Sequence, residues 1–137
     1  MTHYGVRRPF MTRWRDNDQY GHLNNVVYYE AMDTAVNAWM IAEAALDPAA
    51  SPAIALVVSS SCDFRASASF PEPLDVGIGV DRLGTTSITW ALAILREGAD
   101  EPIAVGRFVH VFVDAGTRRP VPVPDAVRAA VEAQLLR

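Results

Sequence analysis

Side chains that can donate, accept or carry a proton are concentrated in a ten-residue segment near the start of the chain. Between residues 16 and 25 the sequence has two carboxylates, a phenol, an imidazole and two amides: Asp16, Asp18, Tyr20, His22, Asn24 and Asn25. A carboxylate in such a setting can attack a carbonyl carbon as a nucleophile or activate a water molecule as a general base. The segment is therefore the first candidate for a catalytic site.

The helix expected directly after this segment would position its polar groups. From Asn25 onward, apolar side chains recur at helical spacing, at Tyr28, Met32, Ala35, Val36 and Trp39. Asn24 or Asn25 is a suitable N-cap, and Asp47-Pro48 should end the segment because proline disfavours helix in the residue before it. A carboxylate just before a helix is stabilised by the free N–H groups and the dipole. A plain capping loop without catalytic function fits the same residues, so both interpretations stay open at this point.

Alternating patterns predict β-strands on both sides of this helix. Residues 5–15 mix aromatic, β-branched and basic residues, which predicts a first strand with a polar face. After the helix, apolar residues recur with a period of two over 54–65, 74–80 and 88–94. The run 104–113 is apolar on both faces, which predicts a central strand covered on both sides.

The connections predict how these strands are joined. Short turns at 83–86 and 96–101 are typical of hairpins, so we expect four sequential antiparallel strands in a meander. Apolar residues four apart from Val127 onward predict a short helix over 125–136. The fold class is therefore α+β. A single helix covers only one face of the sheet and leaves its edges open, which predicts pairing with a second copy.

Composition excludes several functional classes. The 137 residues, half of them hydrophobic, suffice for one core, so we expect a single domain over 1–137. A net charge of -4 without a basic stripe argues against nucleic acids and anionic membranes as partners. The start of the chain lacks a signal peptide and no stretch is apolar enough to cross a bilayer, which predicts a cytoplasmic protein.

We expect no metal and no cofactor. Asp16 and Asp18 lack a third carboxylate at fixed spacing, and the single cysteine, Cys62, lacks a partner at ligand spacing. We expect Cys62 to be a small buried side chain. His110, between two phenylalanines of the last strand, is expected to be a hydrogen-bonded core residue. Ser59–Ser61 lack the glycine-flanked turn of a serine nucleophile.

The string RWRDNDQYGHLNNVVY, residues 13–28, resembles the D-x-D-x-x-G-H-x-N-N-x-x-Y signature of the 4-hydroxybenzoyl-CoA thioesterase family. Segments 62–72, 80–87, 112–114 and 120–124 are also similar to parts of that family. The resemblance implies the hotdog fold, in which a five- to six-stranded antiparallel sheet wraps around a long central helix. It also implies hydrolysis of an acyl-CoA or acyl-carrier-protein thioester to a free acid.

The resemblance assigns roles within the motif. It implies that Asp18 is the catalytic carboxylate, as nucleophile or general base, and that the Asn25 backbone N–H is the oxyanion donor. A fixed helix N-terminus suits that task because it stabilises the negative charge that develops on the carbonyl oxygen. Tyr28 is a further supporting residue of the motif.

Four more motif residues are expected to have supporting roles. Asp16 could hold the loop, His22 could orient Asp18 or fill the turn, and Asn24 could cap the helix. Gly21 is expected to adopt a backbone angle that other residues avoid.

The resemblance also suggests where CoA binds. In the best-known branch of the family, basic residues of one hairpin hold the CoA phosphates, but this chain has Gly84, Thr85, Thr86 and Ser87 there. Their N–H groups and hydroxyls could replace the basic residues, with Arg82 or Arg65 assisting. The fold places its pocket between two subunits, so a homodimer or homotetramer is implied, with Asp18 facing the partner near 62–65.

Two other functions remain open on the sequence alone. One is a hotdog hydratase or dehydratase, although such enzymes usually pair an Asp with a His in a different motif. The other is a non-catalytic acyl-thioester binder, against which the retention of Asp18 counts. The acyl group is open as well, because Tyr28, Trp39, Phe64 and Phe70 would suit either an aromatic or a medium fatty acyl group.

Overall fold

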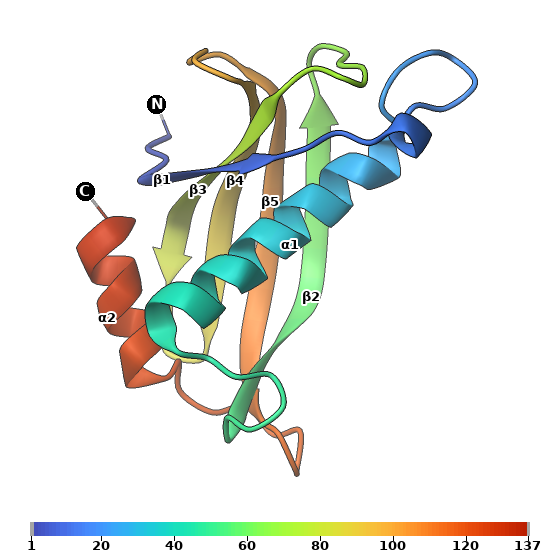
Figure 1. The fold of residues 1–137 in the computed structure, drawn as a ribbon. Helices are drawn as coiled ribbons and strands as arrows, with labels where there is room; N and C mark the ends of the chain where they lie inside the picture. The colour runs from blue at the N-terminus through green and yellow to red at the C-terminus, as the bar shows by residue number, and fades with distance from the viewer. Residues whose placement is uncertain (1, 137) are drawn as a thin grey trace.

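The computed structural model describes residues 2–136, in which one long helix lies across a five-stranded antiparallel sheet (Figure 1). The strand order is β1-β3-β4-β5-β2, and a second, short helix packs beside the first. The elements are β1 (Val6–Phe10), η1 (Trp14–Asp16), α1 (Asn25–Ala44), β2 (Ala53–Phe64), β3 (Leu74–Leu83), β4 (Ser87–Arg96), β5 (Pro102–Asp114) and α2 (Asp125–Gln134). This is the hotdog arrangement, and it confirms the predicted α+β class and the C-terminal helix.

Helix α1 begins where the sequence predicts. Asn24 is the N-cap, and its side-chain oxygen accepts the N–H of Val26 at 3.0 Å. The helix ends at Ala44, three residues before the predicted stop. Ala45 takes the left-handed conformation, with φ of 51°, and its N–H bonds to the carbonyl of Met40, which closes the helix earlier than Pro48 would.

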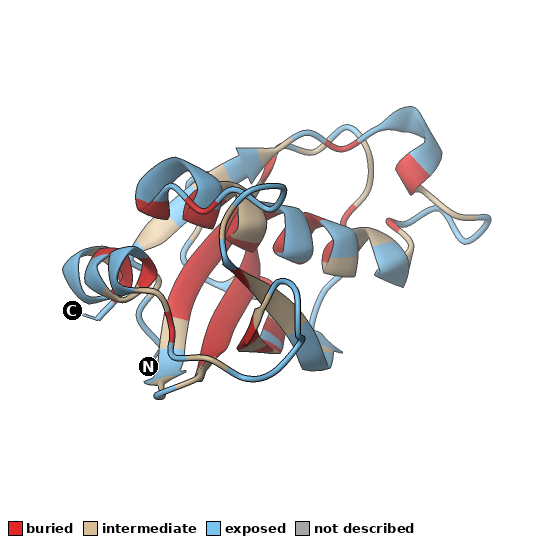
Figure 2. Ribbon diagram, turned by 90° about the horizontal axis from the view of Figure 1, so that it is seen from below, coloured by how far each residue is buried: buried red, intermediate tan, exposed pale blue. Residues whose placement is uncertain are grey.

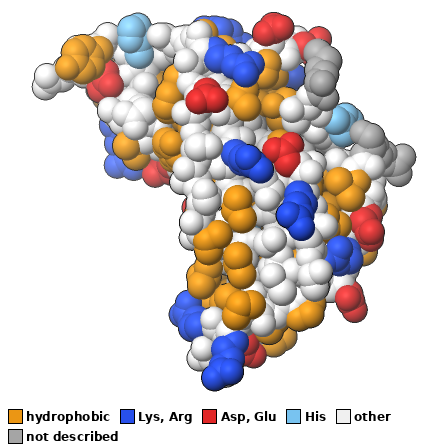
Figure 3. All heavy atoms as spheres, turned by 180° about the vertical axis from the view of Figure 1, so that it is seen from behind, with side chains coloured by type: hydrophobic (Ala, Val, Ile, Leu, Met, Phe, Trp, Pro, Cys, Tyr) orange, Lys and Arg blue, Asp and Glu red, His pale blue; other side chains and the backbone are white. Residues whose placement is uncertain are grey.

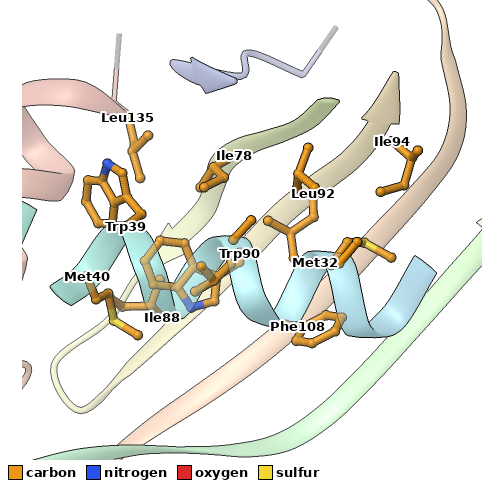
Figure 4. Close-up of a cluster of buried hydrophobic side chains, with 14 of the residues drawn as sticks. Met32, Trp39, Met40, Ile78, Ile88, Trp90, Leu92, Ile94, Phe108 and Leu135 are labelled. Atoms are coloured by element: carbon orange, nitrogen blue, oxygen red, sulfur yellow. The ribbon is translucent and has the colours of Figure 1, made fainter. Parts of the chain in front are cut away.

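The core lies between α1 and the sheet, where Figure 2 shows the buried residues gathered. In Figure 4, Met32, Trp39 and Met40 of α1 face side chains of β3, β4 and β5. The rings of Trp39 and Trp90 meet edge to face at 5.9 Å. All the apolar residues that predicted the helix, from Tyr28 to Trp39, are buried. Trp39 and Met40 therefore belong to the core.

His110 is a core residue, as expected. It is 1% exposed, and its Nδ1 accepts the indole N–H of Trp90 at 2.9 Å. Burial lowers the pKa of His110 to about 4, although the charge of Asp33 acts in the opposite direction. The ring is consequently neutral at physiological pH.

Two predicted features of the sheet are wrong. The first strand spans Val6–Phe10 instead of residues 5–15, because residues 13–16 close a 3-10 turn through the 2.9 Å bond from the N–H of Asp16 to the carbonyl of Arg13. The meander contains only β3, β4 and β5. Strand β2 pairs with β5 and not with β3, because the nine residues 65–73 cross β5 and β4 and are too long for a tight hairpin.

The strand covered on both sides is β4, not β5. Every residue of β4 from Ile88 to Leu95 is buried, whereas on the outer face of β5 Val105, Val109 and Val111 are half-buried and Arg107 is exposed. Figure 3 shows this outer side of the molecule, with apolar patches between charged side chains. Cys62 is also half-buried instead of fully buried, because it lies on the edge strand β2.

No helix within residues 2–136 is long and apolar enough to cross a membrane.

Candidate active site

The polar segment 16–25 forms a loop that projects beyond the first turn of α1 (Figure 1). A β-bridge between Asn17 and Leu23 closes its base. The Asn17 side chain donates to the Ser69 hydroxyl at 2.9 Å and accepts the Phe70 N–H at 3.0 Å. These bonds tie the loop to the crossing segment 65–73, which therefore helps to hold its shape.

The backbone of this loop turns tightly at Gly21. The Asp18 N–H donates to the carbonyl of His22 at 2.9 Å, and the Gly21 N–H donates to the carbonyl of Asp18 at 3.1 Å. Gly21 has φ of 84°, in the region that glycine occupies with least strain. The expectation of an unusual backbone angle at this position is confirmed.

Asp16 holds the base of the loop. It is 3% exposed and accepts the Arg13 backbone N–H at 2.7 Å and the Arg13 guanidinium at 2.9 Å. The same guanidinium reaches Glu30 on α1 at 2.7 Å. Sequence reasoning missed Arg13 and Glu30, because nothing in their spacing shows that one arginine bridges a buried aspartate and a helix.

The carboxylate of Asp18 accepts hydrogen bonds from within its own loop. Its Oδ1 accepts the Tyr20 N–H at 2.9 Å, and its Oδ2 accepts the Asn24 side-chain amide at 3.2 Å. The ring of His22 is exposed and makes no hydrogen bond within the part of the chain that the structure describes. Asn24, and not His22, is therefore the side chain that contacts Asp18.

Asp18 lies at a hollow of about 280 Å³ between the loop, the start of α1 and the end of β2. Tyr28 is 3% exposed, and its ring meets that of Phe64 edge to face at 5.2 Å. Burial raises the pKa of Tyr28. The lining residues are Asp18, Tyr20, His22, Leu23, Asn25, Tyr28, Phe64, Ala66 and Ser67.

Asn25, the first residue of α1, lines the same hollow and has an N–H that is free within the described part of the chain. Within residues 2–136 it donates to no protein acceptor, whereas the N–H of Val26 is capped by Asn24 and that of Val27 by the Asn24 carbonyl. A carboxylate and a free helix N–H at one hollow can act together on a carbonyl group, the first on its carbon and the second on its oxygen.

Two aromatic candidates lie away from this hollow. Trp39 is buried in the core at 1% exposure, and Phe70 packs against Trp14 with ring centroids 6.1 Å apart. The sequence did not point to Leu23, Ala66 and Ser67, whose apolar or small side chains carry no chemical signal. Within residues 2–136 no group of three or more His, Cys, Asp or Glu could hold a metal ion.

The residues expected to bind CoA divide between the two ends of the sheet. Arg65 is exposed and directly precedes Ala66 at the Asp18 hollow. The hairpin 84–87 lies at the opposite end, because Ser87 pairs through Val111 with Leu56. Leu56 is eight residues before Phe64, or about 25 Å along β2 at about 3.3 Å per residue.

At that far end, a second hollow of about 550 Å³ separates the hairpin from the start of α2. Arg82, Gly84 and Thr85 line it together with Arg128, which the sequence analysis missed. Arg128 donates to the Gly84 carbonyl at 2.6 Å. Thr86 supports the hairpin through its carbonyl, which accepts the N–H of Phe112 at 2.8 Å, and the Ser87 carbonyl accepts the N–H of Gly84 at 2.8 Å.

The free edge of β2 is exposed along most of its length. Residues 57–61 are all exposed, including Val57 at 46% and Val58 at 62%. A long strand edge that has no neighbour within residues 2–136 is a site where another strand can pair.

Comparisons with known proteins place this geometry among thioesterases. Residues 12–131 match the family model described as the thioesterase-like superfamily. The PA5185 protein from Pseudomonas aeruginosa strain PAO1 is 48% identical over 96% of this chain and 92% of its own, with a TM-score of 0.93. The PA2801 protein from Pseudomonas aeruginosa is 28% identical over 91% of this chain and 96% of its own, with a TM-score of 0.85.

A 1,4-dihydroxy-2-naphthoyl-CoA thioesterase from Synechocystis shares the fold. It is 18% identical over 91% of this chain and 93% of its own, with a TM-score of 0.81. No curated protein sequence matches the chain significantly.

Proposed function

Because this chain belongs to the thioesterase-like superfamily and is a thioester hydrolase, we propose that it cleaves acyl-CoA with Asp18 as its essential carboxylate. The observation that carries the proposal is that Asp18 borders the same hollow as Asn25, whose N–H donates to no acceptor within residues 2–136. The motif around them supports a closer assignment to the 4-hydroxybenzoyl-CoA thioesterase-like enzymes within the superfamily.

Asp18 and the Asn25 N–H have different tasks in the proposed reaction. The thioester oxygen accepts the Asn25 N–H, which stabilises the charge on that oxygen as the carbonyl carbon becomes tetrahedral. In one route Asp18 takes a proton from water and the resulting hydroxide attacks the carbon. In the other route Asp18 attacks directly and water hydrolyses the mixed anhydride. Both routes break the carbon–sulfur bond and release CoA thiol and a free acid.

The acyl group would lie against the aromatic wall of the Asp18 hollow. Tyr28 and Phe64 are the two aromatic rings that reach this hollow from the helix and from β2. Phe64 is 48% exposed, which leaves apolar surface for the acyl group to cover. Flat rings of this kind suit an aromatic acyl group by stacking and a medium fatty chain by apolar contact.

The CoA tail would bind a second copy of the chain. Antiparallel pairing of two β2 edges turns the partner sheet around, so that its 84–87 hairpin comes to the Asp18 end. This hairpin lies two to three strands from β2, or about 10–15 Å at the usual strand spacing. Arg82 and Arg128 of the partner would then supply positive charge to the CoA phosphates, with Arg65 nearby. An acyl-carrier protein would offer the same phosphopantetheine chemistry.

The test is thiol release from a panel of aromatic and fatty acyl-CoAs by wild type and Asp18→Asn. We expect the substitution to lower kcat by about 100-fold or more, because the amide can neither attack nor take a proton. Asp47→Asn is the matched control. The Asp47 side chain also accepts the backbone N–H of the residue two positions later, at 2.9 Å, but it lies beyond the far end of α1.

Three outcomes separate the candidate functions. Thiol release by wild type and Asp47→Asn but not by folded Asp18→Asn supports the proposal. Hydration of an unsaturated acyl-CoA without thiol release would indicate a hydratase. Tight binding of acyl-CoA without either reaction would indicate a binder.

A further inference from the structure

The side chain of Asn24 joins the two groups that the proposed reaction needs. Its Nδ2 donates to Oδ2 of Asp18 at 3.2 Å, and its Oδ1 accepts the N–H of Val26 at 3.0 Å. Asp18 requires a donor and the Val26 N–H requires an acceptor, so both contacts fix the same orientation of the amide. One side chain therefore connects the Asp18 carboxylate to the first turn of α1.

The backbone of Asn24 is itself fixed. Its N–H donates to the carbonyl of Asp16 at 3.0 Å, and its carbonyl accepts the N–H of Val27 at 2.9 Å. Asp16 is buried and held by Arg13, which also reaches Glu30 on α1. The amide thus extends from a rigid base, and its position is determined by the helix and not by the exposed tip of the loop.

The other support of Asp18 is exposed to solvent. The Tyr20 N–H that bonds to Oδ1 belongs to the tip of the loop, where the Tyr20 side chain is 87% exposed. Without Asn24, the carboxylate would depend on this tip for its orientation. A misplacement of about 1 Å in a catalytic group can reduce a rate by about 100-fold.

We propose that Asn24 is a positioning residue, whose amide holds the Asp18 carboxylate at a fixed place relative to the Asn25 N–H. This inference rests on the proposed function. An N-cap alone does not require asparagine, because serine and aspartate cap helices about as well. Only the amide has an acceptor for the helix and a separate donor for the carboxylate at this side-chain length.

The two roles can be separated by substitution. Asn24→Ser and Asn24→Asp both keep a capping oxygen but lose the amide donor, and Asn24→Ala loses both. We expect Ser and Asp to retain the melting temperature of the wild type while kcat for acyl-CoA falls about 10- to 100-fold with little change in KM. The decrease should be larger for Asp, since a second carboxylate would repel Asp18. Asn24→Ala should lose both kcat and thermal stability.

Asn37→Ser is the matched control on the same helix. The Asn37 amide also donates to an aspartate, Asp33, at 3.2 Å, but it lies three turns away from the Asp18 hollow. Loss of this amide should leave kcat unchanged. Equal losses in Asn24→Ser and Asn37→Ser would refute a specific role for Asn24.

Crystal structures of the wild type and Asn24→Ser test the inference independently of activity. We expect the Asp18 carboxylate to leave its wild-type position, or to become disordered, while α1 still starts at the same residue. An unchanged Asp18 carboxylate would overturn the inference even if the enzyme is active. Absence of thiol release by wild type would instead refute the proposed function, and the position of Asp18 would still decide the role of Asn24.

Discussion

The buried His110 should make the stability of this protein depend on pH below neutrality. His110 is paired across the sheet with Ile88 of β4 and Val57 of β2, and its Nδ1 accepts the Trp90 indole N–H. A protonated ring would carry a hydrogen on Nδ1, would lose this bond and would place a charge in the core. Of the charged groups nearby, Asp33 favours protonation, but burial has the larger effect.

The size of the effect follows from the pKa. Burial lowers the pKa of His110 from 6.5 to about 4, and each unit of pKa shift corresponds to about 1.4 kcal/mol. The shift therefore changes the free energy of unfolding by about 3 kcal/mol in total. Between pH 6.5 and 4 the unfolded chain binds a proton at this residue and the folded chain does not. The free energy of unfolding should therefore be undiminished above pH 6.5 and fall by about 3 kcal/mol as the pH decreases to 4.

Urea unfolding of wild type and His110→Asn at fixed protein concentration, at pH values from 7.5 to 4, measures this contribution. The Asn side-chain oxygen takes the place of Nδ1 as acceptor for Trp90 and does not titrate in this range. His110→Asn should be less stable at pH 7 because of the smaller side chain, but should lose less stability on acidification. His22→Asn, at an exposed imidazole, is the matched control and should keep the wild-type pH dependence. The same pH dependence in His110→Asn and wild type would refute this reasoning.

Two further predictions concern the acyl group and the second copy. Phe64→Ala should raise KM for aromatic acyl-CoAs by about 10-fold more than for acetyl-CoA, because it removes the ring that faces Tyr28. Phe70→Ala is the control, because Phe70 lies outside the hollow, and it should not change KM in this way. Equal effects of the two substitutions would contradict the assignment of Phe64 to the acyl site. Val58→Lys should convert a dimer into a monomer, as measured by light scattering, and should lower the activity, because a lysine on the free edge of β2 opposes strand pairing. A wild type that is already monomeric would disprove pairing through β2.

Local patterns in the sequence predicted elements well and their partners less well. The period of two placed β2, β3, β4 and β5 within a few residues, because side-chain alternation is a property of each strand alone. The pairing of β2 with β5 depends on the path of the segment 65–73, and the alternation of side chains within a strand gives no information about that path. The apolar residues of β5 likewise predict a strand covered on both faces, although its outer face is only partly covered in the structure.

In the candidate site, too, the local features could be predicted from the sequence and the contacts between distant segments could not. Asp18, Asn24 and Asn25 lie within eight consecutive residues, so a short motif and the rules of helix capping were enough to single them out. The residues that complete the hollow come from the end of β2 (Phe64) and from the crossing segment after it (Ala66 and Ser67), and they reach Asp18 only through the fold. The proposed reacting groups of this protein are thus encoded locally, whereas the surface that would select the acyl group is built from distant segments. Substitutions in 64–67 should therefore change which thioester is cleaved, and substitutions in 18–25 should change whether it is cleaved.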